Sequence, residues 1–169
     1  NHYQDKMVGL KFFNVFGPNE YHKGEMRSLV HKAYHEILKT GQVEIFKSHR
    51  PDFKDGEQLR DFVYVKDVCE VMTQIAQNCK SSHSGIYNLG TGQARSFKDL
   101  MLATFRAMGK EAKINYKEMP EQLRGQYQYF TQADMSKLQK VLPQFKFTNL
   151  EAAVDDYVKN HLMQANPNL

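Results

Sequence analysis

Polar side chains that could bind a substrate or move a proton gather in the stretch FFNVFGPNEYHKGEM, residues 12–26. Lys23 could exchange a proton with a substrate or pair with a phosphate, because a lysine beside an apolar wall shifts its pKa readily. Asn14 and His22 place further hydrogen-bonding groups on either side of the Gly17-Pro18 break. A simple turn with solvated side chains explains this stretch equally well when it is taken alone.

Arg60 is a second candidate, and it opens the segment RDFVYV at residues 60–65. An arginine at the mouth of a strand can hold a phosphate through two parallel hydrogen bonds. The alternative is a surface ion pair between Arg60 and Asp61, which would contribute under about 1 kcal/mol if exposed.

Two further segments each leave two interpretations open. Gly90 and Gly92 lie in NLGTG, residues 88–92, but a dinucleotide fingerprint needs a third glycine, which is missing here. A tight turn is therefore preferred over a phosphate cradle. The segment RGQYQYF, residues 124–130, could stack a base and hold a phosphate, or it could be a loop that its aromatic residues pin to the core.

These candidates lie at the ends of predicted strands, which must hold them in place. Alternating apolar residues predict a strand over 8–16, and short apolar runs predict strands over 59–65 and 85–89. The strands at 8–16 and 85–89 are predicted to be buried on both faces, as in parallel sheets. In open α/β sheets, ligands bind beyond the carboxyl ends of the strands, where these candidates fall.

Apolar residues at helical spacing connect the predicted strands. One helix is predicted from near Glu25 to Gly41, where a left-handed glycine would end it. Asp67 is expected to cap the next helix, and Ser96 with Asp99 predicts a capping box before a third. Strands that alternate with helices indicate the α/β fold class.

The composition of the 169 residues, 41% hydrophobic and 25% charged, is typical of a soluble globular protein with one domain or one domain and a small appendage. The net charge of +4 is a weak indication of an anionic partner. Lys and Arg are scattered, without the run expected of a nucleic-acid-binding arm. No apolar run approaches the roughly 18 residues of a membrane helix.

The two cysteines, Cys69 and Cys79, fall on or beside one predicted helix. That spacing is too long for a disulfide, whose Cα atoms lie within about 7 Å. Two free thiols without a signal peptide predict a cytoplasmic location. No Cys–His spacing resembles a zinc site, so no metal is predicted. The opening NHYQDK is typical of the middle of a protein, which predicts that this chain is the distal part of a longer one.

Three motifs follow one another along the chain: NVFGP at 14–18, RDFVYVKDV at 60–68 and YNLGTG at 87–92. In this order and separation they resemble the landmarks of the extended short-chain dehydrogenase/reductase family, which comprises nucleotide-sugar epimerases and dehydratases. The resemblance covers nearly the whole chain. It implies the distal strands and helices of a doubly wound, Rossmann-like sheet plus a small α/β substrate-binding domain.

The resemblance also implies how the chain divides between these two parts. Residues 1–20 and 60–95 would be elements of the Rossmann domain, whereas 21–59 and 96–169 would belong mostly to the substrate domain. The family's N-terminal dinucleotide-binding half, with its Gly-rich turn and its Tyr-x-x-x-Lys, is absent from this sequence.

A narrower resemblance rests on HKGEM at 22–26 and RGQYQYFTQAD at 124–134, and it is to the ADP-L-glycero-D-manno-heptose 6-epimerases. It implies NADP-dependent inversion at C6″ of an ADP-heptose, by transient oxidation and re-reduction, for the heptose of the lipopolysaccharide core. Lys23 would be one of two catalytic bases and would lie near the nicotinamide. Val15 would contact NADP.

The same resemblance assigns a set of residues to the ADP-sugar substrate: Asn14, Glu25, Lys32, Phe46, Lys47, Ser48, His49, Arg60 and Tyr127. The sequence departs from the family pattern at four places. Phe16 replaces a Tyr, Asn19 replaces an Arg, Lys32 replaces a His, and the 47–59 loop is several residues longer.

The fragment is expected to be enzymatic only when joined to its missing half, and by analogy to form a homo-oligomer when complete. No nucleic-acid or membrane partner is expected. Two alternatives stay open: another nucleotide-sugar 4-epimerase or dehydratase that uses UDP or GDP, and a non-catalytic basic module that binds RNA or an acidic protein.

Overall fold

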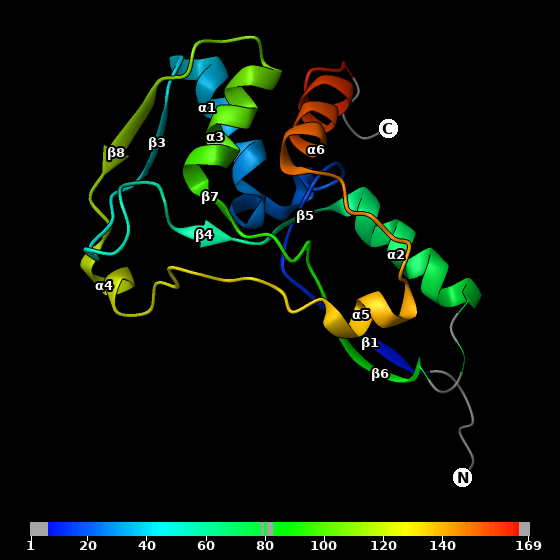
Figure 1. Cartoon of the computed structure of the whole chain (residues 1–169). Helices are drawn as coiled ribbons and strands as arrows, with labels where there is room; N and C mark the ends of the chain where they lie inside the picture. Colours follow the sequence, from blue (N-terminus) through cyan, green and yellow to red (C-terminus); the bar gives the residue numbers. More distant parts are fainter. Residues whose placement is uncertain (1–6, 79, 81–82, 166–169) are drawn as a thin grey trace.

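The computed structural model describes residues 7–78, 80 and 83–165, so Cys79 and the opening NHYQDK lie outside the described residues. Its strands are β1 (Val8–Phe12), β2 (Asn14–Phe16), β3 (Val43–Phe46), β4 (Leu59–Arg60), β5 (Phe62–Tyr64), β6 (Gly85–Leu89), β7 (Arg95–Ser96) and β8 (Ile114–Lys117) (Figure 1). Its helices are η1 (Tyr21–Met26), α1 (Leu29–Thr40), α2 (Val65–Asn78), α3 (Phe97–Ala107), α4 (Glu121–Arg124), α5 (Ser136–Val141), α6 (Leu150–Tyr157) and η3 (Val158–Leu162).

The strands pair in twos, and most of the pairs are parallel. β1 pairs with β6, β2 with β5 and β3 with β8 in parallel, whereas β4 and β7 are antiparallel. Parallel strands need crossover connections, which the helices between them supply. The predicted α/β class is therefore confirmed.

The run at 8–16 forms two strands rather than one continuous strand. The backbone N–H of Phe13 donates to the Leu89 oxygen at 3.0 Å, and that of Asn14 donates to the Asp61 oxygen at 3.0 Å. Successive N–H groups of an extended chain point to opposite sides, so at Phe13 the chain changes partner from β6 to β5. This switch brings Asn14 and Val15 beside Phe62.

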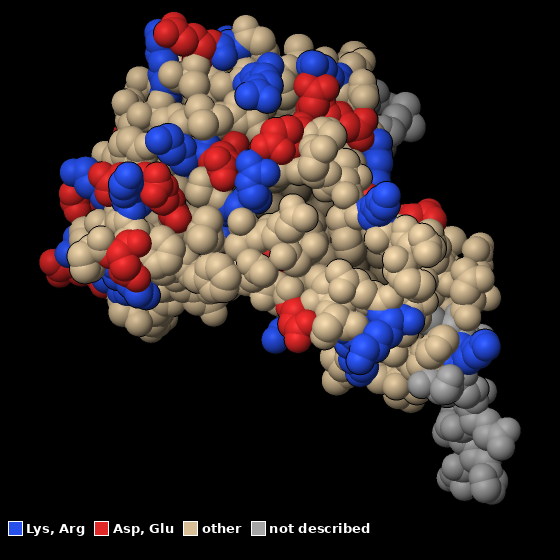
Figure 2. All heavy atoms as spheres, in the orientation of Figure 1, with Lys and Arg blue, Asp and Glu red and all other residues tan. Residues whose placement is uncertain are grey.

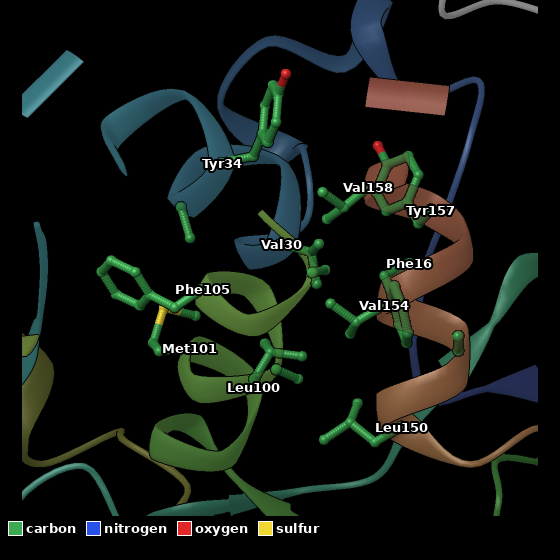
Figure 3. Packing of buried hydrophobic residues seen from close by; sticks show 14 of the residues in the cluster. Phe16, Val30, Tyr34, Leu100, Met101, Phe105, Leu150, Val154, Tyr157 and Val158 are labelled. Carbon is green, nitrogen blue, oxygen red and sulfur yellow. The ribbon is translucent and has the colours of Figure 1, made fainter. Parts of the chain in front are cut away.

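Strand β5 separates two hydrophobic cores because its side chains alternate between its faces. Phe62 and Tyr64 join a cluster built by β3, α1, α3 and α6, while Val63 joins one built by β6, α2 and α5. In Figure 1 these groups occupy the two sides of the molecule, with β5 between them. Figure 3 shows Leu100 of α3 facing Leu150 and Val154 of α6 across the first core.

Within the described residues, strands β1 and β6 are covered on one face only, so the burial on both faces predicted for them would need further neighbours. Leu10 and Tyr87 lie on the face covered by α2 and α5, but Lys11 and Ile86 on the opposite face are exposed, Ile86 to 72%. Phe12 is also 50% exposed. Nothing in the described part of the chain covers this apolar surface.

Two helix boundaries also differ from prediction. α1 begins at Leu29, where the Ser28 side chain caps it, because Gly24 adopts φ 53° and ψ −123° and interrupts the preceding turn. Gly41 ends α1 in the left-handed conformation, as predicted. Asp67 is not an N-cap, because α2 already begins at Val65.

Asp67 instead links α2 to the segment before α6. Its carboxylate accepts hydrogen bonds from the backbone N–H and the hydroxyl of Thr148, both at 2.8 Å. The capping box of Ser96 and Asp99 at the start of α3 is confirmed. The bonds of Asp67 and the capping box fix the positions at which α2, α3 and α6 enter and leave the cores.

Positive and negative side chains interleave over the β3, β8 and α3 side of the molecule (Figure 2). This face therefore offers no extended surface of one sign that would attract a polyanion. No described helix is long and apolar enough to cross a membrane.

Candidate functional site

Arg60 lies between two aromatic rings at the end of β4. Its guanidinium carbon is 5.4 Å from the centre of the Phe97 ring and 5.2 Å from that of Tyr127, which are cation–π distances. Its Nη1 donates to the Leu59 carbonyl oxygen at 2.8 Å. The residue is only 9% exposed, so the two rings and the backbone hold the guanidinium in one place.

The Arg60 charge has no carboxylate within ion-pair distance in the part of the chain that the structure describes. Burial lowers the pKa of Arg60 below its usual value. Burial also raises the pKa of the Tyr127 hydroxyl, and the nearby Arg60 opposes that rise. Burying a cation without a paired anion costs desolvation free energy, and a bound anion would offset that cost.

Asp61 does not pair with Arg60, so the surface ion pair considered as an alternative is wrong. Its carboxylate is fully buried and accepts four hydrogen bonds. They come from the N–H and hydroxyl of Thr91, both at 2.7 Å, from the Gly92 N–H at 2.9 Å and from the Ala133 N–H at 3.0 Å. Asp61 therefore fastens two distant loops to the end of the strand that carries Arg60.

The same bonds decide between the two interpretations of the glycine turn. The N–H groups of Thr91 and Gly92, which a phosphate cradle would need, already serve Asp61. A Cβ on Gly90 would come within 2.7 Å of both the Asp61 carboxylate and the Ala133 Cβ. Gly90 therefore permits close approach, and the tight-turn interpretation is supported.

Replacing Asp61 with Asn should destabilise the chain by about 2–6 kcal/mol. The amide nitrogen of Asn cannot accept, so two backbone donors lose their partner, at about 1–3 kcal/mol each. Urea unfolding followed by circular dichroism would measure this. The control is Asp52→Asn, which removes a surface pair with Arg50 and should cost under about 1 kcal/mol. Equal unfolding free energies for Asp61→Asn and the wild type would contradict the role given to Asp61.

The segment that follows β3 lies near Arg60 but is mostly engaged elsewhere. The Phe46 ring stands edge-on to Tyr127, with centroids 6.4 Å apart at 85°. Lys47 pairs with Glu118 at 2.9 Å, and His49 Nε2 lies 3.3 Å from the same carboxylate. Of the predicted contacts at residues 46–49, Phe46 alone touches the rings around Arg60.

Ser48 is bonded within its own loop, because its backbone N–H donates to Asp55 Oδ1 at 2.8 Å and its hydroxyl to the Arg50 carbonyl oxygen at 2.9 Å. The His49 backbone N–H donates to the Tyr129 hydroxyl at 3.0 Å. The polar groups of Lys47, Ser48 and His49 are therefore already paired, within the loop or with Glu118 and Tyr129, whereas the guanidinium of Arg60 has no carboxylate partner among the described residues.

The segment 124–130 combines both of its interpretations. Tyr129 is buried and pins the loop, whereas Tyr127 stacks against Arg60. Arg124 points elsewhere, since its Nε donates to the Met119 carbonyl oxygen at 2.9 Å. One aromatic residue of this segment thus faces the candidate anion site, and another anchors it.

A cleft of about 220 Å³ opens beside Asn14 and Val15, at the switch between β1 and β2. It is lined by Asn14, Val15, Phe16, Met26, Arg27, Ser28, Leu29, Val30, Phe62, Phe97 and Leu100. Phe97 forms part of its wall and also stacks on Arg60, so the cleft and the anion site share a side chain. Of the predicted site residues, Asn14 and Val15 therefore meet in the cleft, whereas Arg60, Tyr127 and Phe46 meet around the anion site.

Lys23 lies outside that cleft. It is exposed on η1 and lines a hollow of about 530 Å³ with Val65, Lys66, Cys69 and other residues of the α2 side. Its ammonium has no carboxylate within ion-pair distance among the described residues. The structure therefore does not bring Lys23 into one pocket with Asn14 and Val15.

Glu25 and Lys32 form a pair with each other. Lys32 Nζ lies 3.3 Å from Glu25 Oε2 and donates to the Glu25 carbonyl oxygen at 2.5 Å. The Glu25 side chain is 94% exposed. The pair therefore joins the η1 loop to the first turn of α1, and no contact with Arg60 or its rings is seen for either residue in the described part of the chain.

Sequence reasoning assigned no site role to Phe97, Arg27 or Ser28. Phe97 follows the capping residue Ser96. The sequence signal that could have identified it is a large apolar residue at the start of a helix, directly after strand residues. Arg27 and Ser28 reach the cleft because the break at Gly24 turns the chain back toward Asn14, which helical spacing alone would not predict.

The chain is similar to known sequences over nearly its whole length. The sequence model of the NAD dependent epimerase/dehydratase family matches residues 1–90. An ADP-L-glycero-D-manno-heptose-6-epimerase of Nitratidesulfovibrio vulgaris is 52% identical over 165 residues, which are 98% of this chain and 50% of the relative. One of Fusobacterium nucleatum is 51% identical over 160 residues, which are 91% of this chain and 48% of the relative. The chain thus spans about half the length of these relatives.

Solved structures show the same fold. The ADP-L-glycero-D-manno-heptose-6-epimerase of Helicobacter pylori superposes with a TM-score of 0.75 at 30% identity, covering 92% of this chain and 44% of that one. The UDP-glucose 4-epimerase of Thermotoga maritima superposes with a TM-score of 0.73 at 24% identity, covering 94% and 46%. Both likenesses confirm a Rossmann-like epimerase architecture for the described residues.

Proposed function

Because the chain belongs to the NAD dependent epimerase/dehydratase family, we propose that it supplies the sugar-nucleotide site and one base of an ADP-heptose 6-epimerase. The complete enzyme would invert C6″ of an ADP-glycero-manno-heptose, for the heptose of the lipopolysaccharide core, and would act as a homo-oligomer. The chain itself carries the substrate side of this reaction.

The observation that carries the proposal is the unpaired guanidinium of Arg60 between Phe97 and Tyr127. A nucleotide-sugar has a pyrophosphate that accepts from a guanidinium in a bidentate manner. It also has a base that can stack on an aromatic ring. Arg60 would hold a phosphate, and Tyr127 with Phe46 would offer ring faces and edges beside it.

The sequence identity to relatives favours an ADP-heptose as the substrate over other sugar nucleotides. Two relatives near 50% identity are ADP-heptose epimerases. The UDP-glucose 4-epimerase of Thermotoga maritima is 24% identical, which carries the fold but not the substrate. A UDP- or GDP-sugar enzyme is therefore the second candidate.

We propose that the nicotinamide cofactor that the family uses is NADP and that it would lie against Val15 and Lys23, which line separate hollows in this chain. Val15 is half-buried in the cleft beside Asn14, and Lys23 offers an exposed ammonium without a carboxylate partner among the described residues. When bound, the cofactor supplies the acceptance and return of a hydride.

The chain's own residues would bind the substrate and move a proton. Inversion presents the C6″ oxygen on each face in turn, so each face needs its own proton transfer. Lys23 Nζ would exchange the proton of the C6″ oxygen on one face. Asn14 would orient the sugar by hydrogen bonding, and the apolar wall of Phe62 and Phe97 would exclude water from the cleft.

Replacing Arg60 with Ala should weaken ADP binding about 10–100-fold. A hydrogen bond to a charged group contributes about 1.5–3 kcal/mol, and each 1.4 kcal/mol is a factor of ten. Titration calorimetry of the chain with ADP would measure the change. In the complete enzyme, KM for the ADP-sugar should rise with kcat nearly unchanged, the pattern of lost uniform binding.

Arg50→Ala is the matched control, because Arg50 also stacks on two rings but already pairs with Asp52. Its removal should leave the Kd for ADP unchanged. If Arg60→Ala altered kcat alone, or left ADP binding intact, the phosphate role would be wrong.

A further inference from the structure

Glu20 is a buried carboxylate placed just before the loop that carries Lys23. It is 4% exposed, and its oxygens accept three hydrogen bonds. The Ser28 backbone N–H donates at 2.7 Å and the Ser28 hydroxyl at 2.5 Å, while the Tyr157 hydroxyl donates at 2.8 Å. Tyr157 itself is fully buried on α6.

These bonds close the loop between residues 21 and 27 at its base. Glu20 begins the loop and Ser28 ends it, so one carboxylate holds both ends together. Within the loop, the Lys23 N–H donates to the Glu20 carbonyl oxygen at 3.0 Å. The side chains from His22 to Met26 are exposed. Tyr21 packs on the first core and Lys32 bonds to Glu25, so both also hold the loop, but Glu20 joins its two ends.

No described lysine or arginine lies within ion-pair distance of Glu20. Burial, with a contribution from His35, lowers the pKa of the neighbouring His31 to about 4, so that imidazole is neutral at pH 7. A buried carboxylate without a cation depends on its hydrogen bonds and on the positive end of the helix that Ser28 caps. Breaking one bond should therefore loosen the whole closure.

We propose that Glu20 is a positioning residue that fixes Lys23 for proton transfer, with Tyr157 coupling this anchor to α6. This role rests on the proposed function of Lys23. The Glu20 carboxylate would not touch the substrate; it restricts the backbone of the loop from which the Lys23 side chain projects. Reactions that need a positioned proton donor lose rate when such restriction is lost.

Limited trypsin digestion of the 169-residue chain tests the anchor without any assay of activity. Trypsin cleaves after Lys23 and Arg27, which both lie in the closed loop. Glu20→Gln removes acceptor capacity and should raise the rate of cleavage at these sites about tenfold or more, because cleavage follows the open population. Glu111→Gln, an exposed charge elsewhere, is the matched control and should leave the rate unchanged.

Kinetics of the complete enzyme test the positioning role. Glu20→Gln should lower kcat about tenfold or more while KM for the ADP-sugar stays within about twofold, since the phosphate site is separate. Tyr157→Phe removes one of the three hydrogen bonds, so it should also speed trypsin cleavage and lower kcat, but by less than Glu20→Gln. If Glu20→Gln fails to fold, as judged by circular dichroism, Tyr157→Phe and Ser28→Ala carry the test.

Unchanged cleavage after Lys23 in these variants would overturn the anchor. Faster cleavage with unchanged kcat would overturn the positioning role. Failure of the proposed function would give a different result from these two outcomes. Arg60→Ala would then still bind ADP, while Glu20→Gln would still be cleaved faster than the wild type.

Discussion

Replacing Lys23 with Met lowers kcat of the complete enzyme by about 10²–10⁴-fold, the usual contribution of a general acid–base group. Met keeps the length of the side chain but cannot exchange a proton. Lys23 has no ion-pair partner in the described part of the chain, so its removal breaks no stabilising contact. The free energy of unfolding should therefore stay the same, and NADP should remain bound.

Steady-state kinetics with ADP-heptose measure this effect, and cofactor absorbance confirms that NADP remains bound. Lys39→Met is the control, because Lys39 is an exposed lysine near the end of α1, away from the cleft. A loss of kcat within about threefold for Lys23→Met would remove Lys23 from the chemistry, since general-base removal costs far more.

The second large effect concerns the chain by itself, which should not epimerise ADP-heptose at a detectable rate. The sequence contains no Tyr-x-x-x-Lys to supply the other base and no complete Gly-x-Gly-x-x-Gly turn to hold the pyrophosphate of NADP. The structure places Lys23 and the cleft of Asn14 in different hollows. A working site therefore needs further groups that connect them.

The isolated chain should also associate. The open face of β1 and β6 exposes 72% of Ile86, and Met7 and Phe12 nearby are 73% and 50% exposed. Apolar sheet surface and uncovered strand edges invite pairing with another chain. Sedimentation velocity should show oligomers that Ile86→Glu reduces, whereas Leu38→Glu, an exposed apolar site on α1, should leave them unchanged. A compact, active monomer would contradict both expectations.

Features of the fold that depend on residues close together in the sequence were predicted correctly. The strand at 85–89, the end of α1 at Gly41 and the Ser96–Asp99 capping box depend on residues a few positions apart, and they are confirmed. The break at Phe13 was missed, because it results from a change of strand partner. Apolar alternation alone cannot reveal which strands will lie on either side.

Some residues of the candidate site were likewise predicted from the sequence, and others were missed. Arg60 and Tyr127 were predicted and lie together, 67 positions apart in sequence, because motif resemblance carries long-range information. The buried role of Asp61 was missed, since its donors lie 30 to 72 positions away. Phe97 was assigned no site role from the sequence, although its ring contacts the guanidinium of Arg60.

The most direct test of the proposed ADP-heptose 6-epimerase function joins this chain to the half of the Nitratidesulfovibrio vulgaris relative that it does not match, and measures epimerisation of ADP-heptose. The joined enzyme should invert C6″, and Lys23→Met in this chain should lower its kcat by about 10²–10⁴-fold while NADP stays bound. A joined enzyme that folds and binds NADP, yet leaves ADP-heptose unchanged or acts faster on a UDP-sugar, would contradict the proposed function.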